Sequence, residues 1–120
     1  MGNHWKDLLV WQKSHALVKL VYLGLKELPD NEKYNLIDQI KRAAVSIPTN
    51  IVEGQTKPTG NDFLRYLYIS RGSLEELRYL SLLSNELGYI PESTFRSIED
   101  HCTEVSFLLN RLILSLHKTP

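Results

Sequence analysis

The chain has 120 residues, of which 42% are apolar, and this suits a single domain spanning residues 1–120 around one core. Its 14 basic and 14 acidic residues cancel, so the charge favours neither a nucleic acid nor a strongly basic partner. Cys102 is the single cysteine, which excludes an intrachain disulfide and makes the reducing cytoplasm the default location. The start lacks a signal-peptide pattern and no apolar run approaches ~20 residues, so we expect no membrane association.

Apolar spacing predicts that the first half of the chain forms two helices. The first runs from about Asp7 to Leu28 and stops at Pro29. Its apolar seam is formed by Val10, Ser14, Leu17, Val21, Leu25 and Leu28. The second runs from about Leu36 to Gly54, and Gly54 fits a left-handed C-terminal cap.

In the second half of the chain, the same apolar spacing predicts two more helices with short connections. The third starts near Asn61 or Asp62 and continues to Leu87, and the fourth runs from just after Pro91 to about Leu116. The fourth helix has an apolar seam of Phe95, Ile98, Cys102, Val105, Leu109, Leu112 and Leu116. Short connections between long rods force antiparallel neighbours, so the expected fold is an all-α, antiparallel up-down-up-down four-helix bundle.

The segment from Ala43 to Gly54 is unusual because Pro48 lies inside its helical pattern. Proline removes a backbone donor and costs about 3 kcal/mol in an ordinary helix interior. Polar residues surround it, so the segment is either a kink with its own polar partners or an interaction site.

A polar cluster is predicted where this segment meets the third helix. Gly72 lies in mid-helix, where glycine costs roughly 1 kcal/mol relative to alanine, and close approach of a neighbouring backbone would compensate. Arg71 could then reach Glu53 or Asn50. The cluster consists of Ser46, Asn50, Glu53, Arg71, Ser73 and Glu76. It either fixes the helix register or forms a ligand site, and we favour the first because buried polar networks commonly specify one packing arrangement.

The third helix carries more apolar residues than one bundle needs. Beside its core face lies a second face of Tyr66, Ile69, Leu80, Leu83 and Leu87. The run from Leu8 to Trp11 is also apolar through a full turn, so one of its sides must face outward. Such a surplus predicts a partner surface, most simply a second copy of the chain. The alternative is scattered exposed residues, which are normal on any protein.

Basic residues gather in the middle of the chain, with Tyr68 and Tyr79 near them. The set consists of Lys41, Arg42, Arg65, Arg71 and Arg78. Cations interleaved with aromatic rings could contact RNA or single-stranded DNA. The alternative is a solvated helix face with ordinary intrahelical ion pairs, and the zero net charge favours this second interpretation.

No pattern in the sequence indicates catalysis, a metal or a cofactor. The histidines His4, His15, His101 and His117 lack the spacing that metal-binding bundles require. Ser46 and Ser73 have no neighbouring histidine base, and Cys102 lies on an apolar seam typical of a core thiol. We therefore expect a protein that is not an enzyme.

Three blocks of this chain resemble one protein family. These blocks are Leu9 to Lys13, Gln39 to Gly54 and Ser70 to Leu77, and the second is the most specific. They are similar to the four-helix bundle proteins encoded in 23S rRNA intervening sequences, and the resemblance covers nearly the whole chain.

The resemblance implies a small bacterial bundle that forms a ring-like homopentamer, with no established catalytic residues. A related branch, the accessory protein of diversity-generating retroelements, partners a reverse transcriptase and binds nucleic acid through a strongly basic surface, from which this neutral chain departs. The leading hypothesis is a non-enzymatic homo-oligomer serving as an assembly or accessory scaffold. The alternative is an RNA- or DNA-binding accessory protein that uses the basic set.

Overall fold

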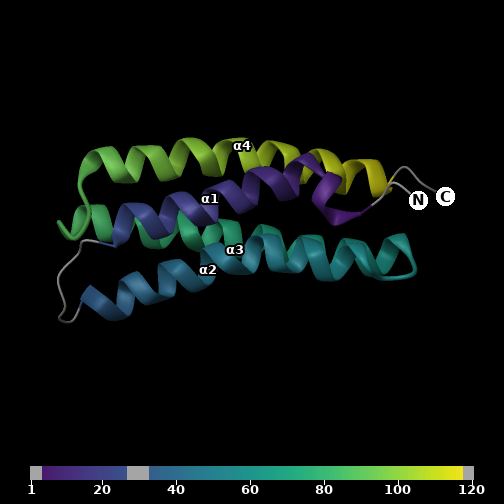
Figure 1. The fold of residues 1–120 in the computed structure, drawn as a ribbon, viewed down its shortest axis with the longest axis horizontal. Coiled ribbons are helices and arrows are strands. Elements are labelled where there is room, and N and C mark those ends of the chain that lie inside the picture. Colours follow the sequence, from purple (N-terminus) through teal and green to yellow (C-terminus); the bar gives the residue numbers. More distant parts are fainter. Residues whose placement is uncertain (1–3, 27–32, 118–120) are drawn as a thin grey trace.

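The computed structural model describes residues 4–26 and 33–117, and all of its long elements are helices (Figure 1). A short 3-10 helix, η1 (Trp5–Asp7), precedes α1 (Leu9–Leu25) and α2 (Lys33–Gln55), and α3 (Gly60–Glu86) and α4 (Glu92–His117) complete the chain. No strand occurs in the part of the chain that is described. The predicted all-α four-helix bundle is confirmed.

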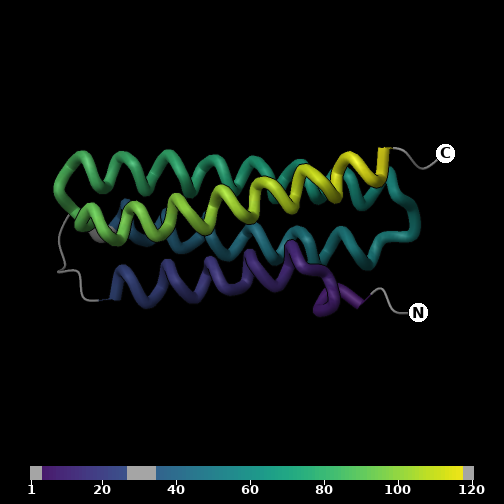
Figure 2. The backbone as a smooth tube through the Cα atoms, turned by 90° about the horizontal axis from the view of Figure 1, so that it is seen from above, coloured from purple at the N-terminus to yellow at the C-terminus, as the bar shows by residue number. Residues whose placement is uncertain are grey.

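The helices form an elongated bundle in which each helix packs against two neighbours. In cross-section the order is α1, α2, α3, α4, and within the described ranges the backbones of the diagonal pairs α1–α3 and α2–α4 do not approach each other closely. The bundle measures 49 × 20 × 19 Å. Successive helices run in opposite directions, so the start of η1, the end of α4 and the α2–α3 connection lie at one end (Figure 2).

The first helix differs most from its prediction. Instead of one helix beginning at Asp7, η1 ends at Asp7, Leu8 is extended, and α1 begins at Leu9. The break lets Leu8 pack against the core, and the Gln12 side chain donates a 2.9 Å hydrogen bond to the Lys6 carbonyl across it. The predicted end at Leu28 lies outside the described residues. The other helix boundaries lie within about three residues of those predicted.

The ends of α3 follow from local chemistry. Thr59 caps its start, where the Thr59 hydroxyl oxygen accepts the Asp62 backbone N–H at 3.1 Å. Its C-terminal end has Gly88 at φ +80°, and the Tyr89 N–H reaches back to the Ser84 carbonyl at 2.8 Å. A left-handed glycine followed by this bond is the usual way to satisfy the last carbonyls of a helix.

The core consists of the predicted apolar seams. Leu17, Ile47, Leu74 and Leu109 are fully buried, one from each long helix. The second apolar face of α3 is buried only in part: Leu80 is buried, whereas Ile69 and Leu87 are exposed.

The role predicted for Gly54 is wrong. Gly54 lies inside α2 and does not have a positive φ, so it is not a left-handed cap. A Cβ at this position would lie 2.6 Å from Tyr66 Cβ and 2.9 Å from Phe63 Cδ1. The absence of a side chain at Gly54 therefore lets the end of α2 approach the start of α3.

We predict that Gly54→Ala destabilises the bundle, because the new methyl group would clash with the Cβ atom of Tyr66. That atom is bonded directly to the α3 backbone, so it cannot move away without shifting the helix. Overpacking of this kind typically costs about 1–3 kcal/mol, measured here as the free energy of unfolding in urea. Gly60→Ala is the control, since its Cβ would meet only Leu116 Cδ2 at 4.0 Å. Equal stabilities for the two variants would contradict this account of Gly54.

Candidate functional site

The turn around Pro48 is stabilised by side-chain donors. Proline has no N–H, so the Ala44 carbonyl lacks its helical donor. The next three carbonyls each accept a side-chain hydrogen bond. These bonds are Thr49 Oγ1 to Val45 at 2.8 Å, Asn50 Nδ2 to Ser46 at 2.8 Å and Ser70 Oγ to Ile47 at 2.9 Å. The buried bond from Ser70 joins α3 to the proline-containing turn of α2.

A second polar contact joins the same two helices. Asn50 Nδ2 lies 3.0 Å from Ser46 Oγ, and the hydroxyls of Ser46 and Ser73 are 2.7 Å apart. The three side chains therefore form a hydrogen-bonded chain from α2 to α3. Serine and alanine side chains on these facing surfaces are small, which explains why α2 and α3 pack more intimately than any other pair of helices.

The structure assembles only half of the predicted polar cluster. Ser46, Asn50 and Ser73 come together, but Glu53 and Glu76 are exposed. The prediction that Arg71 reaches Glu53 or Asn50 is wrong, because its guanidinium donates to Asn110 Oδ1 at 3.0 Å. Adjacent helical positions diverge by about 100°, so when Ser70 faces α2 its neighbour Arg71 faces α4.

The prediction that Gly72 allows close approach of another helix of the bundle is also wrong. Gly72 is exposed on α3, and a Cβ placed on it would meet nothing within 4 Å.

Carboxylates neutralise most of the predicted basic set. Arg42 pairs with Asp38 at 3.0 Å and Arg65 lies 3.9 Å from Asp62. Arg78 contacts Glu99 at 2.6 Å and Glu75 at 3.2 Å. The hydrogen bond from Glu99 is the largest cause that holds the pKa of Arg78 above its usual value.

The remaining two members of the set lie over aromatic rings. The Lys41 ammonium is 5.0 Å from the centre of the Tyr22 ring, and the Arg71 guanidinium is 5.0 Å from that of Tyr68. These two cations have no acidic partner in the described part of the chain.

Cys102 is a poor nucleophile in this fold. Its side chain is buried in the core, and desolvation, with a smaller contribution from Glu99, raises the pKa of the thiol to about 12. Thiolate chemistry requires the deprotonated form, which burial disfavours. Among residues 4–26 and 33–117, no three histidine, cysteine or carboxylate side chains come together to hold a metal ion.

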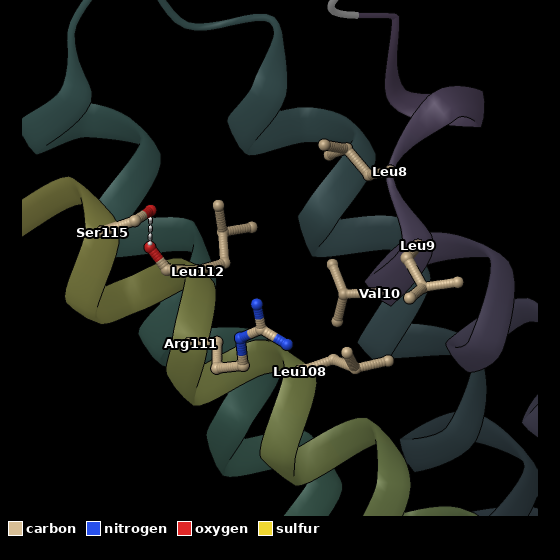
Figure 3. A pocket seen from close by; sticks show the side chains of 7 residues that line it. All are labelled: Leu8, Leu9, Val10, Leu108, Arg111, Leu112 and Ser115. Carbon is tan, nitrogen blue, oxygen red and sulfur yellow. Dashed lines mark hydrogen bonds between the residues drawn. The ribbon is translucent and has the colours of Figure 1, made fainter.

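The surface has hollows with apolar walls. One of about 290 Å³ lies between the start of α1 and the end of α4, and Arg111 is its only charged lining residue (Figure 3). Another of about 270 Å³ lies between α1 and α2 and includes Pro48 in its wall. In the second hollow the Thr49 hydroxyl donates to the Val45 carbonyl and His15 stacks on Trp11, so each of these polar side chains already has a structural contact.

A row of four aromatic rings beside the α1–α2 hollow was not predicted. Successive ring centres of His4, Trp5, Trp11 and His15 are 4.7, 4.8 and 4.8 Å apart. The spacing of Trp11 and His15, four residues apart on one helix face, could have revealed part of it. The contact of Trp5 with Trp11 depends on the break at Leu8, which the periodicity does not show.

Comparisons with known proteins agree on one family. Residues 6–111 match the profile of the 23S rRNA-intervening sequence protein. The chain belongs to this family. A search among curated proteins finds no match. A solved structure from Bacteroides thetaiotaomicron, described as a protein of unknown function from the S23 ribosomal protein family, is 28% identical with a TM-score of 0.75, covering 92% of this chain and 100% of that one.

For this member of the family, we predict that Ser70→Ala lowers stability. The buried Ile47 carbonyl would lose a hydrogen bond beside Pro48, at a cost of about 1–3 kcal/mol. Thr49→Ala removes a similar bond at an exposed position, where water can replace the hydroxyl, and should stay within about 0.5 kcal/mol. Urea unfolding of both variants measures the difference. A Ser70→Ala variant as stable as Thr49→Ala would show that the α3 hydroxyl does not stabilise the proline turn.

Proposed function

We propose that this member of the family is a non-enzymatic cytoplasmic homo-oligomer, a ring of five bundles that serves as an assembly or accessory scaffold. The number five comes from the family resemblance. None of the described helices is long and apolar enough to cross a membrane. The serines singled out in the sequence, Ser46 and Ser73, contact each other instead of a histidine base, and the thiol of Cys102 is buried.

Exposed apolar side chains on α3 and α4 carry the proposal. Ile69 and Tyr79 on α3 are 52% and 60% exposed, and Phe107 and Leu114 on α4 are 61% and 60% exposed. Phe107 and Leu114 are two turns apart on one side of α4, so they form a continuous ridge. Large apolar groups that recur at helical spacing outside a complete core are typical of a protein interface.

We expect light scattering of the purified chain to give a mass of about five times the 13.9 kDa of one chain at micromolar concentration. The reason is that the exposed apolar side chains lose contact with water when copies associate. Dilution in the same experiment would measure how tightly they associate. A single-chain mass at micromolar concentration would contradict the oligomer.

Nucleic-acid binding is the second candidate, and one charge pattern supports it. No acidic residue occurs from Phe63 to Leu74 on α3 or from Val105 to His117 on α4. These stretches lie at the end of the bundle where the chain starts (Figure 2). They carry Arg71 beside the Tyr68 ring and Arg111 beside the Phe107 ring. Cations next to exposed rings suit single-stranded nucleic acid.

If nucleic acid is a ligand, structured or single-stranded RNA should bind at low salt and weaken as salt rises, because phosphate contacts release counterions. A fluorescence titration at low and moderate salt tests this. Arg71→Gln should then weaken binding, whereas Arg42→Gln should change it little, since Arg42 already pairs with Asp38. Absence of binding even at low salt would eliminate this candidate.

A further inference from the structure

Gly72 has no explanation within its own chain. It lies within the 27-residue helix α3, where glycine costs about 1 kcal/mol relative to alanine. Its position is exposed, and a side chain there would meet nothing within 4 Å. A methyl group would fit and stabilise the helix, so neither packing nor backbone conformation inside one bundle requires glycine.

The surroundings of Gly72 form an uncovered apolar surface with one free charge. Ile69 lies one turn before it and Tyr79 two turns after it, both more than half exposed. Glu76, one turn after it, has no basic partner among the described residues. We call this surface the Gly72 notch: Ile69, Gly72, Glu76 and Tyr79.

The outer side of α4 presents the complementary shape and charge. Phe107 and Leu114 project from it with Arg111 between them, and we call these three residues the Phe107 ridge. The Arg111 guanidinium lies 5.5 Å from the centre of the Phe107 ring and has no carboxylate partner in the part of the chain described. The notch is thus apolar with an unpaired anion, and the ridge is apolar with an unpaired cation.

We propose that the Phe107 ridge of one copy packs into the Gly72 notch of the next copy, with Arg111 facing Glu76 across the interface. This inference rests on the proposed homo-oligomer and names its contact. The ridge covers the space left by the missing side chain of Gly72, so the glycine lets the partner helix approach closely. The interface is heterologous, because each copy contributes its notch to one neighbour and its ridge to the other.

The heights of the two surfaces along the bundle agree with this contact. In a ring whose axis runs along the bundle, all copies lie at the same height, so α3 of one copy faces the same level of α4 in the next. The hydrogen bond from Arg71 to Asn110 fixes that correspondence within one chain. Gly72 therefore lies at the level of Asn110, between Phe107 and Arg111, which are each within about one helical turn of it.

The directions of the two surfaces favour a closed ring. α3 and α4 are neighbouring helices of a four-helix bundle, so their outer sides point about 90° apart. In a closed ring, the directions from one copy to its two neighbours differ by about 90° for four copies and by about 108° for five. Binding surfaces on opposite sides of a copy would instead give an open chain. In such a ring, the α3–α4 side with Arg71 and the 2.7 Å Tyr68–His117 contact faces the central axis.

The decisive experiment is Gly72→Leu, because it separates folding from assembly. Leucine is a good helix former, and its Cβ at this exposed position would meet no atom of its own chain within 4 Å, so circular dichroism should show unchanged helix content. It fills the notch, so light scattering should show a fall towards the mass of one chain. Ala16→Leu adds comparable bulk to an exposed position on α1 and should remain assembled.

A second arm tests the ridge and its charge. Phe107→Ala should raise the concentration at which the oligomer dissociates about tenfold or more, because a central aromatic contact is lost. Arg111→Glu should dissociate it by repulsion from Glu76, and adding Glu76→Arg in the same chain should restore assembly. An oligomeric wild type whose mass is unchanged in the Gly72→Leu and Phe107→Ala variants would overturn this interface alone. A monomeric wild type would instead overturn the proposed function itself.

Discussion

The contact between α2 and α3 is the constraint on which the rest of the bundle depends. α2 contains a proline that removes one backbone donor, and the Ser70 hydroxyl of α3 hydrogen-bonds to a carbonyl of the same turn. This bond requires the helices to be close, and Gly54 and the serines of the interface are small enough to allow it. The proline therefore marks where α3 must dock, and the direction of that docking turns Arg71 towards α4.

Much of the fold could be predicted from the sequence because burial has a helical period. The seam residues Leu17, Leu74 and Leu109 are buried as predicted. The break at Leu8 could not be predicted, since an uninterrupted apolar turn fits one helix as well as two. The roles predicted for Gly54 and Gly72 are wrong for a related reason. Sequence shows where a side chain is missing but not whether the cause is a positive φ, a close helix or a partner.

The polar site was only half predictable. The hydrogen bond between Ser46 and Ser73 follows from two small polar residues on facing helices. Arg71 was assigned to the wrong helix because a one-dimensional pattern does not state how α3 is rotated about its axis. The same limit applies to charge. Although the net charge is zero, the cations fall into two groups. Some, such as Arg78, pair with carboxylates, whereas others, such as Arg71 and Arg111, lie over aromatic rings.

Gly54 and Gly72 show how one physical cost can be offset in two places. Each glycine weakens its helix by about 1 kcal/mol relative to alanine. At Gly54 the compensation lies inside the bundle, where Phe63 and Tyr66 occupy the space that a side chain would need. At Gly72 that space is empty and opens outward. The proposed ring supplies the missing compensation, because the exposed Phe107 and Arg111 of a neighbouring copy lie within about one helical turn of the unfilled position.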